Sequence, residues 1–179
     1  MKNLLVGQSG GPTAVINASL YGVVKAALAS PEIGHVYGIV NGIEGMLQDH
    51  TLDLGESLSE EDLELLKLTP AAYLGSCRYK LPESLTDAFY ETIFEKFRRM
   101  EIGYFLYIGG NDSMDTVSKL SRYAAHHGSD IRFIGIPKTI DNDLIQTDHT
   151  PGYASAAKYV AASVREIALD ASVYQQKAV

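Results

Sequence analysis

The sequence predicts an α/β fold, a three-layer α/β/α arrangement around a mostly parallel sheet. Short runs that are almost entirely apolar alternate along the chain with longer runs whose apolar residues recur at helical spacing. Strands that are apolar on both faces are typical of parallel sheets covered by helices on either side. Of the 179 residues, 46% are hydrophobic and 21% are charged, which is the composition of a globular domain.

The first part of the chain predicts two strands and one long helix. "NLLVG" at 3–7 is a short apolar run that ends in glycine, as a buried strand does. Residues 13–29 follow as a helix, with Thr13 available near its N-cap. "HVYGIV" at 35–40 is the second strand, and "NGIEGML" at 41–47 is expected to be a glycine-marked loop.

The rest of the chain continues the alternation. A short helix is predicted over 57–67, because its "SLSEED" start resembles a capping box. Further helices are expected over 84–100, 113–126 and about 150–170, with strands over 104–109 and 132–137. Arg98 and Arg99 end the first of these helices, where cations complement the helix dipole.

Charge and cysteine content exclude several classes of function. The formal net charge of −7 leaves no basic surface for nucleic acid or for an anionic membrane. No run of about 18 apolar residues is present, and the N-terminal apolar run is too short for a signal peptide. The single cysteine, Cys77, excludes an internal disulfide framework. We therefore expect a soluble, cytoplasmic protein.

Three predicted strands end in turns that suit anion binding. These turns are "GQSGGPTAVINAS" at 7–19, "IGGNDSMDT" at 108–116 and "GIPKTIDNDL" at 135–144. Ligands of parallel sheets bind outside the carboxyl ends of the strands, so the turns should converge on one crevice. Backbone N–H groups and helix dipoles can hold a phosphate there without a basic surface. The first turn has neither the P-loop nor the dinucleotide-binding spacing.

The segment "PKTIDND" at 137–143 carries the clearest chemistry. Lys138, Thr139, Asp141 and Asp143 follow directly after a predicted buried strand. A solvated turn with an aspartate as a helix cap would explain only one of the two acids. Phosphoryl transfer explains the combination better, since one carboxylate accepts a hydroxyl proton, another holds Mg²⁺ and the lysine offsets phosphate charge.

Six motifs in order resemble the phosphofructokinase family. They are "SGGPTAVINA", "NGIEGML", "LGSCRYKL", "YIGGNDSMDT", "PKTIDNDL" and "TDHTPGYASAAKY". The resemblance runs from about Leu4 to the last helix and implies transfer of a phosphoryl group to the 1-hydroxyl of fructose 6-phosphate. It implies Asp141 as the catalytic base and places Thr139, Ile140 and Asp143 with it at the sugar phosphate.

The same resemblance implies the residues at the phosphoryl donor. Gly11, Arg78 and Gly110 match donor-binding positions. ATP-using relatives typically carry Gly-Gly-Asp-Gly where this chain has Asn111 and Asp112 after two glycines. Asp112 would fill the volume of that last glycine and repel the α-phosphate of ATP.

Lys138 favours the same phosphoryl donor. It stands where ATP-using relatives usually have a small residue, and pyrophosphate-dependent relatives share "PKTIDND". The resemblance therefore favours a reversible, pyrophosphate-dependent phosphotransferase in which Lys138 and Asp112 act with Asp141 at the catalytic centre. Asn111 is assigned to Mg²⁺, since an amide oxygen can coordinate that ion. The alternatives are an ATP-dependent 6-phosphofructokinase and a non-catalytic phosphate-binding module.

The resemblance also bears on domain organisation. Residues 1–145 are interpreted as an N-terminal α/β domain for the phosphoryl donor, and residues 146–179 as the start of a second, substrate-binding domain. The family also uses an "MGR"-type motif and several arginines that this sequence does not contain in matching positions. The 179 residues alone are therefore expected to be inactive. The whole protein is expected to form a homodimer or homotetramer.

Overall fold

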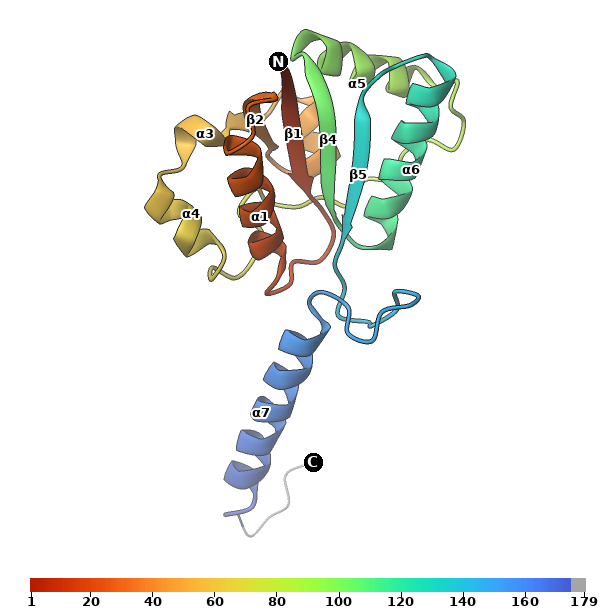
Figure 1. Ribbon diagram of the computed structural model, residues 1–179. Helices are drawn as coiled ribbons and strands as arrows, with labels where there is room; N and C mark the ends of the chain where they lie inside the picture. Colours follow the sequence, from red (N-terminus) through yellow and green to blue (C-terminus); the bar gives the residue numbers. More distant parts are fainter. Residues whose placement is uncertain (175–179) are drawn as a thin grey trace.

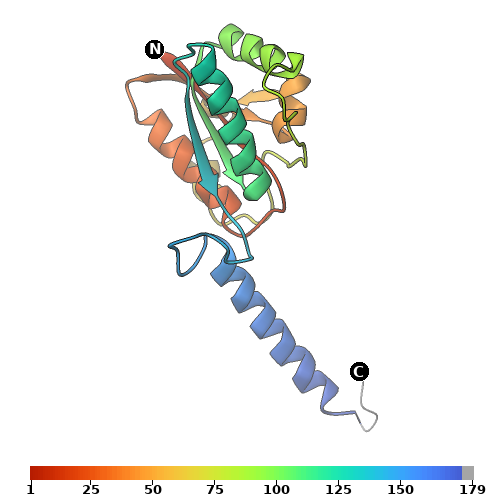
Figure 2. The same cartoon turned by 90° about the vertical axis from the view of Figure 1, so that its right-hand side faces the viewer.

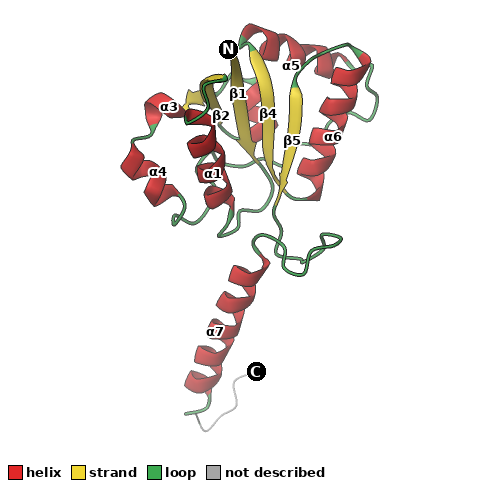
Figure 3. Ribbon diagram, viewed as in Figure 1, coloured by secondary structure: helices red, strands yellow, loops and turns green. Residues whose placement is uncertain are grey.

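The computed structural model describes residues 1–174, and its centre is a five-stranded sheet between two layers of helices (Figures 1 and 3). The strands are β1 (Lys2–Gln8), β2 (Ile33–Ile39), β3 (Thr51–Asp53), β4 (Ile102–Gly109) and β5 (Arg132–Pro137). Their order across the sheet is β3-β2-β1-β4-β5. Only the short β3 runs antiparallel, so the predicted α/β fold with a mostly parallel sheet is confirmed.

Helices cover both faces of the sheet, as near-continuous apolar strands require. The helices are α1 (Ile16–Leu28), α2 (Gly42–Leu47), α3 (Leu54–Ser57), α4 (Glu60–Leu66), α5 (Ala88–Arg99), α6 (Asn111–His126) and α7 (Tyr153–Ala171). Side chains of α2, α5 and α6 pack on one face in a core rich in tyrosine and phenylalanine. Side chains of α1, α3 and α4 pack on the other face in an aliphatic core.

The segment predicted as a glycine-marked loop at 41–47 is instead the helix α2. Asn41 and Gly42 have positive φ angles of 60° and 54°, so the turn itself is present but occupies only the start of the segment. Gly45 then allows the helix to approach the preceding strand, because a Cβ there would lie 1.6 Å from the carbonyl oxygen of Val40. The glycines serve close packing, and Ile43 is fully buried behind them.

Helix ends follow local sequence with two corrections. The predicted helix at 57–67 is divided, and α4 begins after a capping box between Ser59 and Asp62, with hydrogen bonds of 3.1 and 3.0 Å. Thr13 does not cap α1, whose N-cap is Val15 with no side-chain hydrogen bond. Arg98, in the last turn of α5, pairs with Glu91 at 2.6 Å.

The last helix, α7, extends away from the sheet (Figures 1 and 2). None of its residues is buried, and Tyr159, Val164 and Ile167 are exposed along it. The proposed domain boundary near residue 145 lies in the irregular segment between β5 and α7. Within the described residues, no helix is both long and apolar enough to span a membrane.

Candidate functional site

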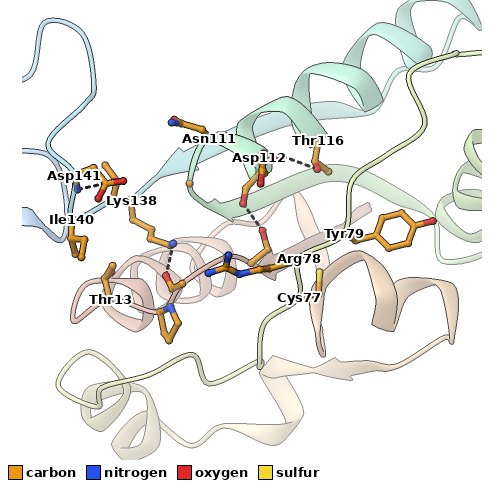
Figure 4. A pocket seen from close by; sticks show the side chains of 17 residues that line it. Thr13, Cys77, Arg78, Tyr79, Asn111, Asp112, Thr116, Lys138, Ile140 and Asp141 are labelled. Carbon is orange, nitrogen blue, oxygen red and sulfur yellow. Dashed lines mark hydrogen bonds between the residues drawn. The ribbon is translucent and has the colours of Figure 1, made fainter.

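The three glycine- and acid-rich turns meet at the carboxyl edge of the sheet, around a cavity of ≈ 420 Å³ (Figure 4). Each turn follows one of the adjacent strands β1, β4 and β5, which explains their convergence. The cavity is lined by Ser9, Gly10, Gly11, Pro12, Thr13, Cys77, Arg78, Tyr79, Gly110, Asn111, Asp112, Ser113, Thr116, Lys138, Thr139, Ile140 and Asp141. The predicted convergence is therefore confirmed.

The first turn presents backbone to the cavity. Gly10 has a φ angle of +76°, a conformation that side chains disfavour. Its N–H donates to the carbonyl of Cys77 at 3.1 Å. No atom lies within 4 Å of the position of a Cβ on Gly11, so the backbone of this residue is open to a ligand.

The second turn leads into α6 at the rim of the cavity. Gly110 is the N-cap, and the 16-residue helix begins at Asn111, two residues earlier than predicted. The first amides of a helix have no carbonyl partner within it, and the helix dipole favours an anion at this end. Asp112 stands in this first turn, so its carboxylate occupies the end of α6 that also attracts phosphate.

Below this helix start, Gly109 is required by packing. The hydroxyls of Ser9 and Ser113 are hydrogen-bonded in the buried floor of the cavity. A Cβ on Gly109 would lie 1.9 Å from the Oγ of Ser113. The close approach of the first and second turns therefore depends on this glycine.

Lys138 is the most unusual side chain of the site. It is only 4% exposed, and its Nζ donates to the carbonyl oxygen of Gly11 (Figure 4). Burial lowers the pKa of the Lys138 amine, the nearby Arg78 lowers it further, and Asp141 opposes both. The fold thus places two cations, Lys138 and Arg78, at a cavity that Asp112 and Asp141 also line, and a bound phosphate would stabilise the charged form of the buried Lys138.

The third turn is fixed by its own side chains. The N–H of Asp141 donates to Oγ1 of Thr139 at 3.0 Å. Asn142, with a φ angle of 54°, accepts from the N–H of Thr150 at 2.9 Å and donates to the carbonyl of Asp148 at 3.1 Å. The Asp141 side chain is exposed at the cavity, where a carboxylate can accept a proton from a substrate hydroxyl.

Asp143 differs from the other predicted residues because it does not line the cavity. Its Oδ2 accepts a hydrogen bond of 3.0 Å from Nδ2 of Asn111. This bond fixes the Asn111 amide and leaves its oxygen available as a ligand. Residues 1–174 contain no group of three or more acids, histidines and cysteines placed to hold a metal.

One lining residue was predicted only through resemblance, and several others were not predicted. Arg78 was identified only through resemblance, because the segment around it has no helix or strand to reveal its position. Ser113 and Thr116 lie on the cavity side of α6, which the spacing of the helix would have shown had its start been placed at Asn111. Tyr79 has no local signal in the sequence.

Comparison with known proteins identifies one family. The family model described as Phosphofructokinase matches residues 3–179. A pyrophosphate–fructose 6-phosphate 1-phosphotransferase of Methylococcus capsulatus is 48% identical over 172 residues, which are 94% of this chain and 40% of that protein. The chain thus spans about 40% of the length of four curated relatives that are 46–48% identical to it.

Solved structures agree with these relatives. The crystal structure of a pyrophosphate-dependent phosphofructokinase from Nitrosospira multiformis matches with a TM-score of 0.88 and 44% identity. That of a pyrophosphate-dependent phosphofructokinase from Marinobacter aquaeolei matches with a TM-score of 0.85 and 47% identity. Each match covers 95% of this chain and 42% of the other chain.

Proposed function

The chain belongs to the phosphofructokinase family, and we propose that its cavity takes part in transferring a phosphoryl group from pyrophosphate to the 1-hydroxyl of fructose 6-phosphate. In this proposal the reaction gives fructose 1,6-bisphosphate and phosphate and is reversible. The observation that carries the proposal is the joint placement of buried Lys138 and the Asp112 carboxylate at one cavity.

Asp112 supports pyrophosphate over ATP as the phosphoryl donor. Its carboxylate lies in the first turn of α6, the position that a further phosphate of a nucleotide would approach. Two unit charges 4 Å apart repel by about 1 kcal/mol even in water, which corresponds to about fivefold in affinity. Pyrophosphate has no third phosphate and no nucleoside, so it avoids this repulsion and still meets Lys138 and Arg78.

Asp141 is proposed as the catalytic base. It would accept the proton of the attacking 1-hydroxyl, while the hydrogen bond from its N–H to Thr139 keeps the turn in place. Thr139, Ile140 and Asp143 are proposed on the acceptor side of the cavity. Gly11, Gly110 and Arg78 are proposed on the donor side, where backbone N–H groups and a guanidinium suit phosphate oxygens.

Magnesium is proposed as the cofactor, with Asn111 as one ligand. When bound, it would offset the charge of the donor phosphates. The protein's own part is to hold the Asn111 amide through Asp143 and to place the buried amine of Lys138 beside the transferring group. We further propose that the whole protein acts in the cytoplasm as a homodimer or homotetramer, with residues 146–179 opening its acceptor-binding domain.

A coupled assay of the whole protein with fructose 6-phosphate, Mg²⁺ and either pyrophosphate or ATP tests the donor assignment. We expect turnover with pyrophosphate and, in Asp112→Gly, a rise of at least about fivefold in kcat/KM for ATP. Ser118→Gly, at an exposed position of the same helix outside the cavity lining, controls for the glycine itself. Turnover of the unmodified protein with ATP alone would contradict the proposal.

A further inference from the structure

Residues 69–78, which we call the strap, bring Arg78 to the cavity without forming a helix or a strand. Leu74 is 1% exposed and Cys77 is 9% exposed, so part of the strap lies in the interior. Buried backbone N–H and C=O groups need hydrogen-bond partners, and here no sheet ladder provides them. The position of the strap therefore depends on side chains from elsewhere in the fold.

Two buried amides supply partners between Thr69 and Leu74, and Asn41 adds hydrogen bonds from its N–H to the carbonyl of Leu74 at 2.7 Å and from its Nδ2 to the carbonyl of Ser76 at 3.2 Å. Gln8, at the end of β1, is 0% exposed, and its Oε1 accepts from the N–H of Leu74 at 2.9 Å. Asn17, in the first turn of α1, is 1% exposed and accepts from the N–H of Tyr73 at 2.8 Å. Its Nδ2 donates to the carbonyl of Thr69 at 3.0 Å. The two amides are themselves bonded, from Gln8 Nε2 to Asn17 Oδ1, at 3.0 Å.

The other end of the strap is bound to the first turn. The hydroxyl of Ser76 donates to the carbonyl of Gly10, and the N–H of Gly10 donates to the carbonyl of Cys77 at 3.1 Å. Gly75, between Leu74 and Ser76, has a φ angle of +71°. Arg78 follows directly, so its backbone comes just after the bonds to Gly10 and four residues after the bond between Gln8 and Leu74.

We propose that Gln8 and Asn17 are positioning residues that hold Arg78 toward the phosphoryl donor. Neither lines the cavity, so both act through the backbone of Tyr73 and Leu74. This inference rests on the proposed function for the identity of the ligand. Loss of either amide should weaken use of the phosphoryl donor and leave use of the sugar phosphate unchanged, because the acceptor-side residues belong to a different turn.

Hydrogen exchange of the whole protein tests how the strap is held and does not depend on enzyme turnover. In Gln8→Met, peptides that cover residues 69–78 should exchange at least about tenfold faster, since an amide loses its partner. Asn3→Leu is the matched control: Asn3 is also buried and makes bonds of 2.8 and 2.9 Å to backbone, but at the opposite end of β1. Unchanged protection of the strap in Gln8→Met would overturn the inference.

Asn17→Asp provides a second variant in case Gln8→Met does not fold. It keeps an acceptor for the N–H of Tyr73 but loses the donor to Thr69. We expect faster exchange in this variant confined to the strap. Equal acceleration throughout the sheet would show a general loss of stability instead, which would also overturn the inference.

Kinetics separate positioning from stability. We expect Gln8→Met to raise the KM for pyrophosphate about tenfold and to leave the KM for fructose 6-phosphate within about twofold. In a protein that already carries Arg78→Met, Gln8→Met should raise the KM for pyrophosphate by less than about twofold, because the guanidinium that Gln8 positions is gone. A rise in the KM values for both substrates would contradict the inference. So would a double variant in which the fold-changes of Gln8→Met and Arg78→Met in the KM for pyrophosphate multiply in full. If ATP proves to be the phosphoryl donor, the donor proposal fails, and the same comparison made with ATP still decides the positioning.

Discussion

Lys138 and Lys119 are two buried lysines whose charges should affect the free energy of unfolding in opposite ways. Both are buried lysines, 4% and 5% exposed. Lys119 on α6 contacts Glu83 at 2.7 Å and Asp115 at 2.9 Å, and these hydrogen bonds, that of Asp115 first, raise its pKa. Lys138 has one hydrogen bond to a carbonyl and a lowered pKa. Replacement of each by methionine should therefore change stability in opposite directions.

Lys138→Met removes a desolvated charge and keeps the buried methylene stem. Its hydrogen-bond partner, Gly11, is exposed, so water can replace the lost bond. We expect the free energy of unfolding to rise by about 1 kcal/mol, and the melting temperature by about 2–4 °C. Lys119→Met loses two ion pairs and should cost about 1 kcal/mol, a modest value because Glu83 is 90% exposed. Urea unfolding of both variants measures the difference.

The two lysines should also respond differently to pH. The native pKa of Lys138 lies below the ordinary value of 10.5, so the native protein releases this proton before the unfolded chain does. As pH rises toward 10.5, the free-energy penalty of the buried charge disappears. The difference in free energy of unfolding between the unmodified protein and Lys138→Met therefore becomes smaller. The raised native pKa of Lys119 keeps its contribution constant over the same range. Shifts of the same sign and size in both variants would refute the reasoning.

Three further outcomes are expected. Asp141→Ala should lower kcat in the coupled assay by at least about 10²-fold, because it removes the proposed base. The free energy of unfolding should change little, because Asp141 is exposed. Full activity would exclude Asp141 as the base. Gly45→Ala should cost about 1–3 kcal/mol in urea unfolding, since its Cβ would meet backbone at 1.6 Å, whereas Gly22→Ala meets nothing within 4 Å and should stabilise α1 by about 0.5–1 kcal/mol. Tyr107→Phe leaves the N–H of Ile43 without its 3.2 Å partner and should speed hydrogen exchange of α2 at a cost of about 1–3 kcal/mol; unaltered exchange would count against this.

The sequence was sufficient for the layers of the fold because each long strand carries its own signal. β1 and β4 are buried along nearly their whole length, and apolar runs of that kind mark parallel strands. β3 was not predicted, since three residues are too few for a period and its pairing depends on contact with β2. α2 was taken for a loop because its glycines, read locally, indicate a turn, whereas they allow a contact with Val40.

The sequence predicted which turns form the candidate site but not the side-chain contacts between them. The strand-end rule brought the three turns together, because the edge of a parallel sheet follows from strand direction alone. The burial of Lys138 depends on Gly11, 127 residues away, and local sequence cannot show such a contact. The bond between Asn111 and Asp143 likewise joins two turns. Arg78 required family resemblance, because its segment has no periodicity.

The N-terminal end of α7 is bonded to the third turn, so a tilt of the helix would be transmitted to that turn. Thr139 pairs with Gly152, and the N–H of Thr139 donates to the carbonyl of Pro151 at 3.0 Å. A helix of 19 residues is about 28 Å long, so a tilt of about 5° at this fulcrum moves its far end by about 2.5 Å. A displacement of α7 would therefore reach the third turn at Thr139, two residues from Asp141, the proposed catalytic base.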